Sequence, residues 1–457
     1  MFRLSISKWL TSLMLLTVLV TGCSSPATPT ANPTTSISAT SEPATALPTE
    51  VPPTEIVATA EPYPAPTNDA HINGYPAPTE SAESGYPAPT ESSGPSLVGL
   101  PQITLANINQ VKMVASIPTF LDARIVWSPD GAKFAVFPPY EAGSIQIYDL
   151  TALSLPPVVL SGHAQPITGV AFSPDGTQLA SAGQDGMLFI WDVASGAQRS
   201  SMDVTSLFQN PTFPDTVTFS PDGTKLALFS AENSTLLIFN YPLDNAPPTT
   251  LAWTEHASPV VSVYPSPDWQ TFAWVGRGTL VLMNADGTFR GEQINHEDFI
   301  MNLFYSPDSQ RLFIQTAKTI NGANAGVVIV YDVQTGQALQ TLAHPDFVGT
   351  STLSPDGTTL ATSSANEVNL WDWATGTKTV SISDREDAAQ SLAFSSDSGL
   401  LAGAFNGGVI EVWDAATGQL VLASDTGEIS GVKFVLGGTL LIATQVDGTV
   451  LLFGVVP

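Results

Sequence analysis

A four-residue turn recurs along the C-terminal three-quarters of this chain and constrains its fold more than any other feature. The full copies read Ser-Pro-Asp-Gly, the weaker copies keep part of this pattern, and the eight first positions are Ser128, Ser173, Ser220, Ser266, Ser306, Ser354, Ser395 and Val435. Consecutive copies are 40 to 48 residues apart. Self-similarity at this period indicates a repeat architecture in which one supersecondary unit of this length is stacked on the next.

The cleanest copy of the unit runs from Gly162 to Asp192 and explains its own residue types. In its turn, Ser suits the first position, Pro presets φ at the second, and Gly tolerates the fourth. An apolar run precedes the turn, a small-residue run follows it, and Gln184-Asp185-Gly186 turns the chain into a third run ending at Trp191. Ser195-Gly196 then begins a turn to a fourth strand. The unit therefore predicts a four-stranded antiparallel sheet, the blade of an all-β propeller.

Trp-Asp pairs close the third strand in several copies. They stand at Trp191-Asp192, Trp371-Asp372 and Trp413-Asp414, with degenerate forms at Tyr148-Asp149 and Tyr331-Asp332. Together with the turns, these pairs resemble the WD-repeat β-propeller family over about three-quarters of the chain. The resemblance implies the fold and says little about function.

The resemblance also implies a structural role for one polar set. In the family a Ser–His–Asp–Trp tetrad is hydrogen-bonded within a blade, and the second repeat carries the whole set as His163, Ser181, Asp185 and Trp191. The sixth repeat keeps part of the set, and the seventh has Arg385 in place of the histidine; the sixth-repeat residues are His344, Thr362 and Trp371. A hydrolase interpretation of the Ser/His/Asp trio is disfavoured, because no GxSxG elbow accompanies it.

The histidines share one position in the repeat. All but His71 stand ten residues before the first residue of a turn, at His163, His256, His296 and His344. Because each belongs to a different blade, we expect no metal cluster and no bound cofactor. The turn Asn284-Ala285-Asp286-Gly287 lacks the alternating ligands of a dedicated calcium loop, so we interpret it as a plain turn.

Eight turns and eight third strands predict eight blades. The chain stops at Pro457 with no fourth strand for the last blade, while an apolar segment at 108–115 precedes the first turn without a partner. We expect that segment to supply the missing strand and close the ring, which removes exposed sheet edges. A seven-bladed ring is the alternative, with the weak fourth repeat around Ser266 as its cause.

Composition limits the partners. The chain has 457 residues, 14 Lys+Arg, 41 Asp+Glu and a formal net charge of −27. Phosphate binding needs clustered Lys and Arg, so nucleic acid is not an expected partner. Many aspartates belong to turns, so we interpret the acidity as favouring solubility and expect a monomer.

The N-terminus reads as an export signal followed by a tether. Residues 1–22 have a basic start and a short apolar run that ends in Leu-Val-Thr-Gly-Cys, which resembles the lipobox of bacterial lipoproteins. The resemblance implies lipid attachment to Cys23, the chain's single cysteine, and hence anchoring to the outer face of the cytoplasmic membrane or to an outer membrane. Residues 23–99 are rich in Pro, Thr and Ala and repeat YPAPT, so we expect a disordered tether. Residues 100–457 form the propeller.

Irregular loops suggest where a partner binds. Turns in an up-and-down sheet alternate between its ends, so the SPD turns and Thr-Gly turns share one face and the other hairpins and interblade links share the opposite face. Most insertions fall on that opposite face, where loops on a rigid scaffold commonly bind. The aromatic candidates there are Phe137, Tyr140, Phe208 and Phe213. Unconstrained drift of the loops is the competing interpretation.

Three function classes remain. The leading hypothesis is a non-enzymatic, lipid-anchored propeller that binds a protein or ligand outside the cytoplasmic membrane. The first alternative is an extracytoplasmic hydrolase or lyase acting on polymers, which would need ionisable groups converging on one face or on the central channel. The second alternative is a structural platform for envelope assembly.

Overall fold

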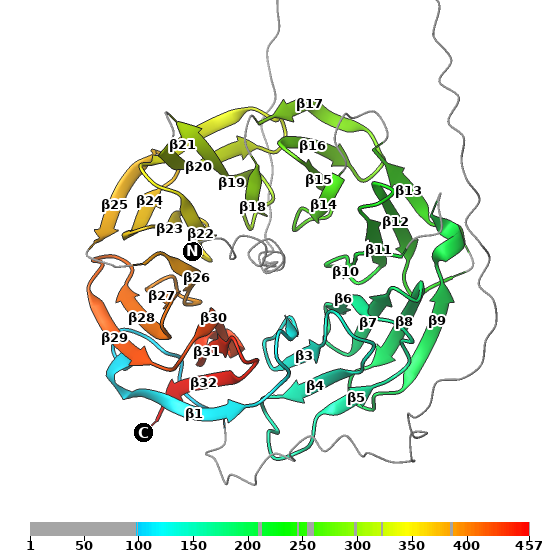
Figure 1. Cartoon of the computed structure of the whole chain (residues 1–457), viewed down its shortest axis with the longest axis horizontal. Helices are drawn as coiled ribbons and strands as arrows, with labels where there is room; N and C mark the ends of the chain where they lie inside the picture. Colours follow the sequence, from blue (N-terminus) through cyan, green and yellow to red (C-terminus); the bar gives the residue numbers. More distant parts are fainter. Residues whose placement is uncertain are drawn as a thin grey trace, which may run out of the picture. The chain divides into compact units, whose positions relative to one another are not determined.

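The fold is an all-β ring of eight blades (Figure 1). The computed structural model describes residue 97 and residues 99–456, except 209–212, 245, 254–259, 297–298, 321–322 and 384–386. Each blade is a four-stranded antiparallel sheet, which confirms the eight-bladed prediction. The seven-bladed alternative is wrong, because the weak repeat around Ser266 forms a complete sheet of its own.

Blades 1 to 4 follow one another along the chain. Blade 1 contains β2 (Arg124–Trp127), β3 (Lys133–Phe137), β4 (Ile145–Asp149) and β5 (Val158–Leu160). Blade 2 contains β6 (Ile167–Phe172), β7 (Gln178–Gly183), β8 (Met187–Asp192) and β9 (Gln198–Asp203). Blade 3 contains β10 (Thr216–Phe219), β11 (Lys225–Ser230), β12 (Thr235–Asn240) and β13 (Thr249–Ala252). Blade 4 contains β14 (Val260–Pro265), β15 (Thr271–Gly276), β16 (Thr279–Asn284) and β17 (Phe289–Asn295).

Blades 5 to 8 complete the ring. Blade 5 contains β18 (Ile300–Tyr305), β19 (Arg311–Ile320), β20 (Ala323–Asp332) and β21 (Ala338–His344). Blade 6 contains β22 (Val348–Leu353), β23 (Thr359–Ser364), β24 (Glu367–Asp372) and β25 (Thr377–Ile382). Blade 7 contains β26 (Ala389–Phe394), β27 (Leu400–Phe405), β28 (Val409–Asp414) and β29 (Leu420–Asp425). Blade 8 contains β30 (Ile429–Val435), β31 (Leu440–Gln445), β32 (Val450–Val455) and β1 (Val111–Ile117). Three short 3-10 helices are η1 (Ile108–Gln110), η2 (Thr205–Leu207) and η3 (Leu436–Gly438).

The ring is closed by the N-terminal strand, as predicted. β1 pairs antiparallel with β32, from Val111 opposite Val455 to Ile117 opposite Val450, and lies on the outside of blade 8 (Figure 1). The predicted strand at 108–115 is shifted, because its first three residues form η1 and the strand continues to Ile117. β1 thus covers an edge of β32 that would otherwise offer unpaired backbone groups to another chain.

The cores lie between blades rather than within them. The core between blades 1 and 2 brings Phe137 and Ile147 of blade 1 against Leu179 and Trp191 of blade 2. The second and third strands are covered on both sides by neighbouring blades, so most of their central residues are buried and apolar or small, and all six residues of β15 are buried.

The recurring turn is stabilised by its own serine and aspartate. In seven turns the Ser Oγ donates to the carboxylate two residues on at 2.5–2.6 Å, and it accepts the N–H five residues on at 2.8–3.0 Å. The fourth residue has a positive φ in all eight copies, including the non-glycine residues Trp269, Ser309 and Ser398. The turn therefore fixes its backbone by side-chain hydrogen bonds even where glycine is lost.

Two faces of the ring are distinguished below. The turn face carries the SPD turns and the turns between the third and fourth strands. The hairpin face carries the hairpins between the second and third strands and the links from one blade to the next. This assignment follows from the antiparallel order of strands in every blade.

Candidate functional site

The four residues of the second repeat lie together between blades 1 and 2. The His163 Nε2 atom is 2.8 Å from the Ser181 Oγ, and its Nδ1 is 3.1 Å from both carboxylate oxygens of Asp185. The Trp191 Nε1–H donates to the same Ser181 Oγ at 2.8 Å. Gly183 passes so close that a Cβ there would lie 2.6 Å from His163 Nδ1.

The burial of these four side chains indicates a structural role rather than a catalytic one. Ser181 is fully buried and Trp191 is 2% exposed, so no substrate reaches the serine hydroxyl. Burial lowers the pKa of His163 below its usual value, while the Asp185 carboxylate opposes that shift. A Ser–His–Asp nucleophile needs an accessible serine oxygen. The arrangement here instead satisfies four buried polar side chains with one another.

The partial copy in blade 6 behaves differently. The Trp371 Nε1–H donates to the Thr362 Oγ1 at 2.9 Å, but both ring nitrogens of His344 are buried without a hydrogen-bond partner. His344 is held at the end of β21, opposite Gly326 of the lengthened β20, and its ring meets Trp371 edge-on with centroids 5.2 Å apart. The histidine is therefore kept out of the polar set by the extended sheet of blade 5.

The other two histidine positions have separate outcomes. In blade 5, the His296 Nε2 is 3.4 Å from the hydroxyl of Tyr331, which replaces tryptophan. His256 and Arg385 lie outside the described residues, as does Cys23.

The structure corrects two of the four aromatic candidates for binding. Phe137 is 1% exposed and packs in the core between blades 1 and 2, while Phe208 is 5% exposed and packs in the core between blades 2 and 3. The expectation that both are available to a partner is wrong, because each fills space beneath its loop. Phe213 is partly buried, and Tyr140 is 64% exposed.

Other exposed apolar side chains join Tyr140 on the hairpin face. Among the described residues, 14 large hydrophobic side chains are exposed. Six of the 14 lie on loops of the hairpin face. Of the described loops that join two strands at the turn face, the one between β4 and β5 carries such a side chain, Leu155. The six are Leu121, Tyr140, Leu207, Phe299, Phe347 and Val446. The sequence did not reveal Phe299 and Phe347, which stand singly in short links.

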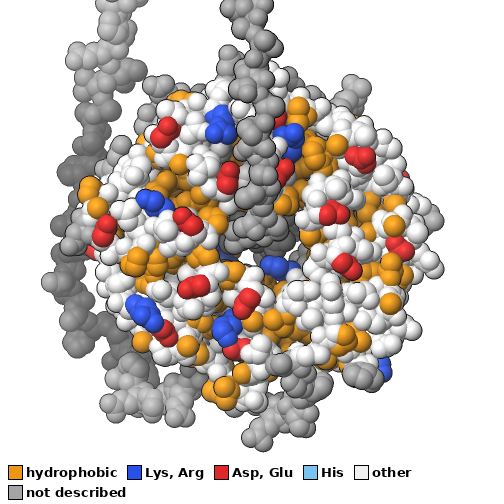
Figure 2. Space-filling view, turned by 180° about the vertical axis from the view of Figure 1, so that it is seen from behind, with side chains coloured by type: hydrophobic (Ala, Val, Ile, Leu, Met, Phe, Trp, Pro, Cys, Tyr) orange, Lys and Arg blue, Asp and Glu red, His pale blue; other side chains and the backbone are white. Residues whose placement is uncertain are grey.

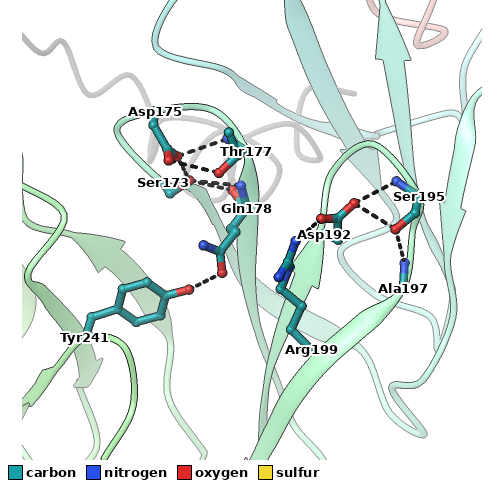
Figure 3. A network of polar contacts seen from close by, with 9 residues as sticks. All are labelled: Ser173, Asp175, Thr177, Gln178, Asp192, Ser195, Ala197, Arg199 and Tyr241. Atoms are coloured by element: carbon teal, nitrogen blue, oxygen red, sulfur yellow. Dashed lines mark hydrogen bonds and ion pairs between the residues drawn. The ribbon is translucent and has the colours of Figure 1, made fainter.

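The turn face carries two adjoining cavities that the sequence did not reveal. The larger is lined by blade 6 alone, the smaller lies between blades 5 and 6, and the two share Gly357 and Trp373. The corresponding seam between blades 2 and 3 is bridged by a polar network in which Tyr241 reaches Gln178 (Figure 3). Trp373 directly follows the Trp371-Asp372 pair. This second tryptophan was the feature of the sequence that could have indicated the cavities.

Charged side chains are dispersed on the ring. On the face shown in Figure 2, acidic and basic side chains are scattered among hydrophobic ones, and the centre is hollowed. Within the described ranges, no three His, Cys, Asp or Glu side chains are placed to share a metal ion. None of the helices in this part of the chain has the length and apolar character needed to span a bilayer.

Comparisons with known proteins agree with the fold. Residues 155–192 and 336–372 match the family model "WD domain, G-beta repeat". A stretch of 102 residues is 40% identical to the 66 kDa stress protein of Physarum polycephalum, covering 21% of this chain and 17% of that protein. The first relatives are thus matched over less than a fifth of their own length.

Longer matches are more distant. A stretch of 283 residues is 23% identical to the guanine nucleotide-binding protein subunit beta of Solanum tuberosum, covering 58% of this chain and 72% of that protein. The crystal structure of the computationally designed Ika8 protein superimposes with a TM-score of 0.57 at 19% identity, over 74% of this chain and 97% of that chain. Two stretches of the chain therefore match WD repeats, and the distant likenesses agree with the β-propeller fold alone.

Proposed function

We propose that this WD-repeat propeller is a non-enzymatic, lipid-anchored extracytoplasmic scaffold that binds a protein partner through its hairpin face. The observation that supports this is that six exposed large apolar side chains lie on loops of that face. Aromatic and aliphatic side chains that protrude from a rigid scaffold are the usual anchors of a protein interface. The ring of eight blades makes the scaffold rigid, because the loops are attached to strands that are packed between neighbouring blades.

The anchoring half of the proposal rests on the sequence. Cys23 follows the apolar run of residues 1–22 at the position where a bacterial lipoprotein is lipidated. Residues 23–99 would then separate the propeller from the membrane. One acyl chain gives only marginal membrane binding, so stable anchoring through Cys23 needs a second lipid chain or another membrane-binding signal.

The buried and hydrogen-bonded state of Ser181 argues against hydrolysis by this residue and so favours a binding role. Ser181, His163 and Asp185 have the residue types of a nucleophilic triad, but the Trp191 indole N–H and the burial of the site occupy the serine. The set therefore ties the link that enters blade 2 to the second and third strands of that blade.

Proximity labelling on intact cells tests both halves. Replacing Tyr140, Phe299 and Phe347 together by serine should remove specific neighbours from the labelled set while the protein stays at the membrane. A matched control replaces Val159, Leu339 and Leu420, which are equally exposed but lie on outer strands. The Cys23→Ala variant should release the protein from the membrane fraction. Unchanged neighbours in the triple variant would refute the hairpin face, and unchanged membrane retention of Cys23→Ala would refute the anchor.

A further inference from the structure

A groove on the turn face runs along blade 6 and reaches blade 5 at its smaller end. It consists of two cavities of about 420 and about 170 Å³ that meet at Gly357 and Trp373. The larger is also lined by Thr358, Thr359, Asp372 and Ala374. The smaller is also lined by Ser306, Pro307, Asp308, Arg311 and Asp356.

Trp373 forms a fixed wall between the two cavities. Its indole Nε1–H donates to the Gly357 carbonyl at 2.9 Å, which pins the ring over the SPD turn of its own blade. Phe313 of blade 5 meets the ring edge-on, with centroids 5.4 Å apart and an interplanar angle of 87°. The side chain is only partly buried, so the indole presents an ordered aromatic surface to solvent.

The seam between blades 2 and 3 shows how such a groove is closed elsewhere. Tyr241 occupies the position of Trp373, directly after the third strand, and its hydroxyl donates to Gln178 across the seam (Figure 3). Arg311 stands where Gln178 stands in its blade, but it turns to Asp332 of its own sheet at 2.8 Å. The seam between blades 5 and 6 therefore lacks this bridge.

The lining of the groove is acidic. The Oδ1 atoms of Asp308, Asp356 and Asp372 accept hydrogen bonds from their own turns. Asp308 and Asp356 are exposed. Arg311 is the cation of the lining, and Asp332 already neutralises it. The two cavities that share Trp373 are therefore lined by three carboxylates, and Arg311, the one basic residue in their lining, is paired with Asp332.

We propose that this groove binds a lysine or arginine side chain of an extended basic segment in a partner protein. An ammonium or guanidinium group over an indole ring is attracted by the negative face of the ring, and nearby carboxylates attract the same cation. Arginine suits the site better than lysine, because its planar group stacks on the ring and binds carboxylates in two places. The net charge of −27 would also attract a basic segment from a distance. The site is on the face opposite the apolar loops, so it is independent of the proposed hairpin-face interface.

Titration of fluorescent peptides against the purified chain tests the site. Tri-arginine and tri-lysine peptides are the probes, and tri-glutamate is the negative control. We expect the arginine peptide to bind most tightly, the lysine peptide more weakly and the glutamate peptide not at all. Asparagine preserves an acceptor oxygen for the turn, so Asp308→Asn with Asp356→Asn should weaken arginine binding about tenfold without unfolding the blade. Trp373→Leu should weaken it about three- to tenfold, the loss expected when a cation–π contact is removed.

The bridged seam supplies the matched variant. Asp175→Asn with Asp222→Asn removes two charges from equivalent turns of blades 2 and 3, where Tyr241 closes the seam. Affinity should change less than twofold in this control. Equal weakening by both pairs would overturn the proposal, since it would mean that the peptide senses only the overall charge. Absence of arginine-peptide binding to the unmodified chain would also overturn it, and neither result would affect the labelling of hairpin-face partners.

Discussion

The hydroxyl of Ser309 accepts a hydrogen bond from the backbone N–H of Asp268 at 3.0 Å, which ties the SPD turn of blade 5 to that of blade 4. Ser398 repeats the contact with Asp356 at 3.4 Å. Both serines occupy the fourth turn position with φ near +60°, where most copies have glycine. The left-handed backbone costs about 1–2 kcal/mol for a residue with a Cβ, and the interblade bond offsets part of this.

Substitutions at Ser309 should separate strain from bonding. Ser309→Ala keeps the Cβ and loses the bond, so the free energy of unfolding should fall by about 1 kcal/mol. Ser309→Gly loses the bond but relieves the positive φ of 62°, so stability should remain close to that of the unmodified chain. Urea unfolding of the purified chain measures both. A glycine variant less stable than the alanine variant would contradict this account.

Loss of the central hydroxyl should destabilise blade 2 more than blade 6. Ser181→Ala removes the partner of both His163 and Trp191, so two buried polar groups lose a bond and stability should fall by about 2–3 kcal/mol. Thr362→Ala removes the partner of Trp371 and a long bond of 3.4 Å to the Asn369 carbonyl, but no histidine loses a bond, and about 1 kcal/mol is expected. Thermal and urea unfolding of the two variants under identical conditions gives the comparison. Equal losses would show that His163 contributes nothing through its serine bond.

His344, buried at the end of β21 in blade 5, should make stability depend on pH. Burial lowers the pKa of His344 to about 4, with the nearby Lys378 adding to the shift and Glu367 opposing it. The unfolded chain, with a histidine pKa near 6.5, binds the proton more readily than the folded chain. Stability from this residue is therefore fully present above about pH 6.5 and is lost as pH falls toward 4, by about 3 kcal/mol in total.

Replacement of His344 by leucine removes this proton linkage. The variant should lose about 3 kcal/mol less than the unmodified chain between pH 7 and pH 4, as measured by urea unfolding at each pH. His163 remains in both proteins, so its own acid sensitivity cancels in the comparison. Parallel pH profiles would show that His344 is hydrated or partnered in the folded state.

The fold could be predicted from the sequence because the turns and strand ends of each blade are specified by short local motifs. The turn at Ser173 and the Trp-Asp pair at Trp191 each specify a backbone shape within a few residues. Closure by β1 followed from counting strands against a chain that ends at Pro457. These features need no knowledge of what lies across a blade boundary.

The exposure of single side chains was harder to predict because it depends on neighbouring blades. Phe208 sits in a loop segment, yet the short helix η2 turns it into the core between blades 2 and 3. His344 has the right spacing for a polar set, yet the ten-residue strands β19 and β20 hold it in the sheet of blade 5. Trp373 does not bridge the seam between blades 5 and 6 as Tyr241 bridges that between blades 2 and 3, and Arg311, at the position of Gln178, bonds to Asp332 of its own blade. Each outcome is decided by residues far away in the sequence.

Removal of the closing strand should convert the ring into a self-associating protein. Deleting residues 97–117 exposes the edge of β32, whose residues 450–455 pair with β1 in the intact ring. An uncovered, apolar edge strand pairs with other chains, so we expect dimers or larger species by size-exclusion chromatography with light scattering, and a lower melting temperature. A deletion of residues 24–90, which retains β1, should stay monomeric. A synthetic peptide of residues 108–117 should restore the monomer by adding back the missing strand. A monomeric deletion variant with the original melting temperature would show that closure does not hold the ring together.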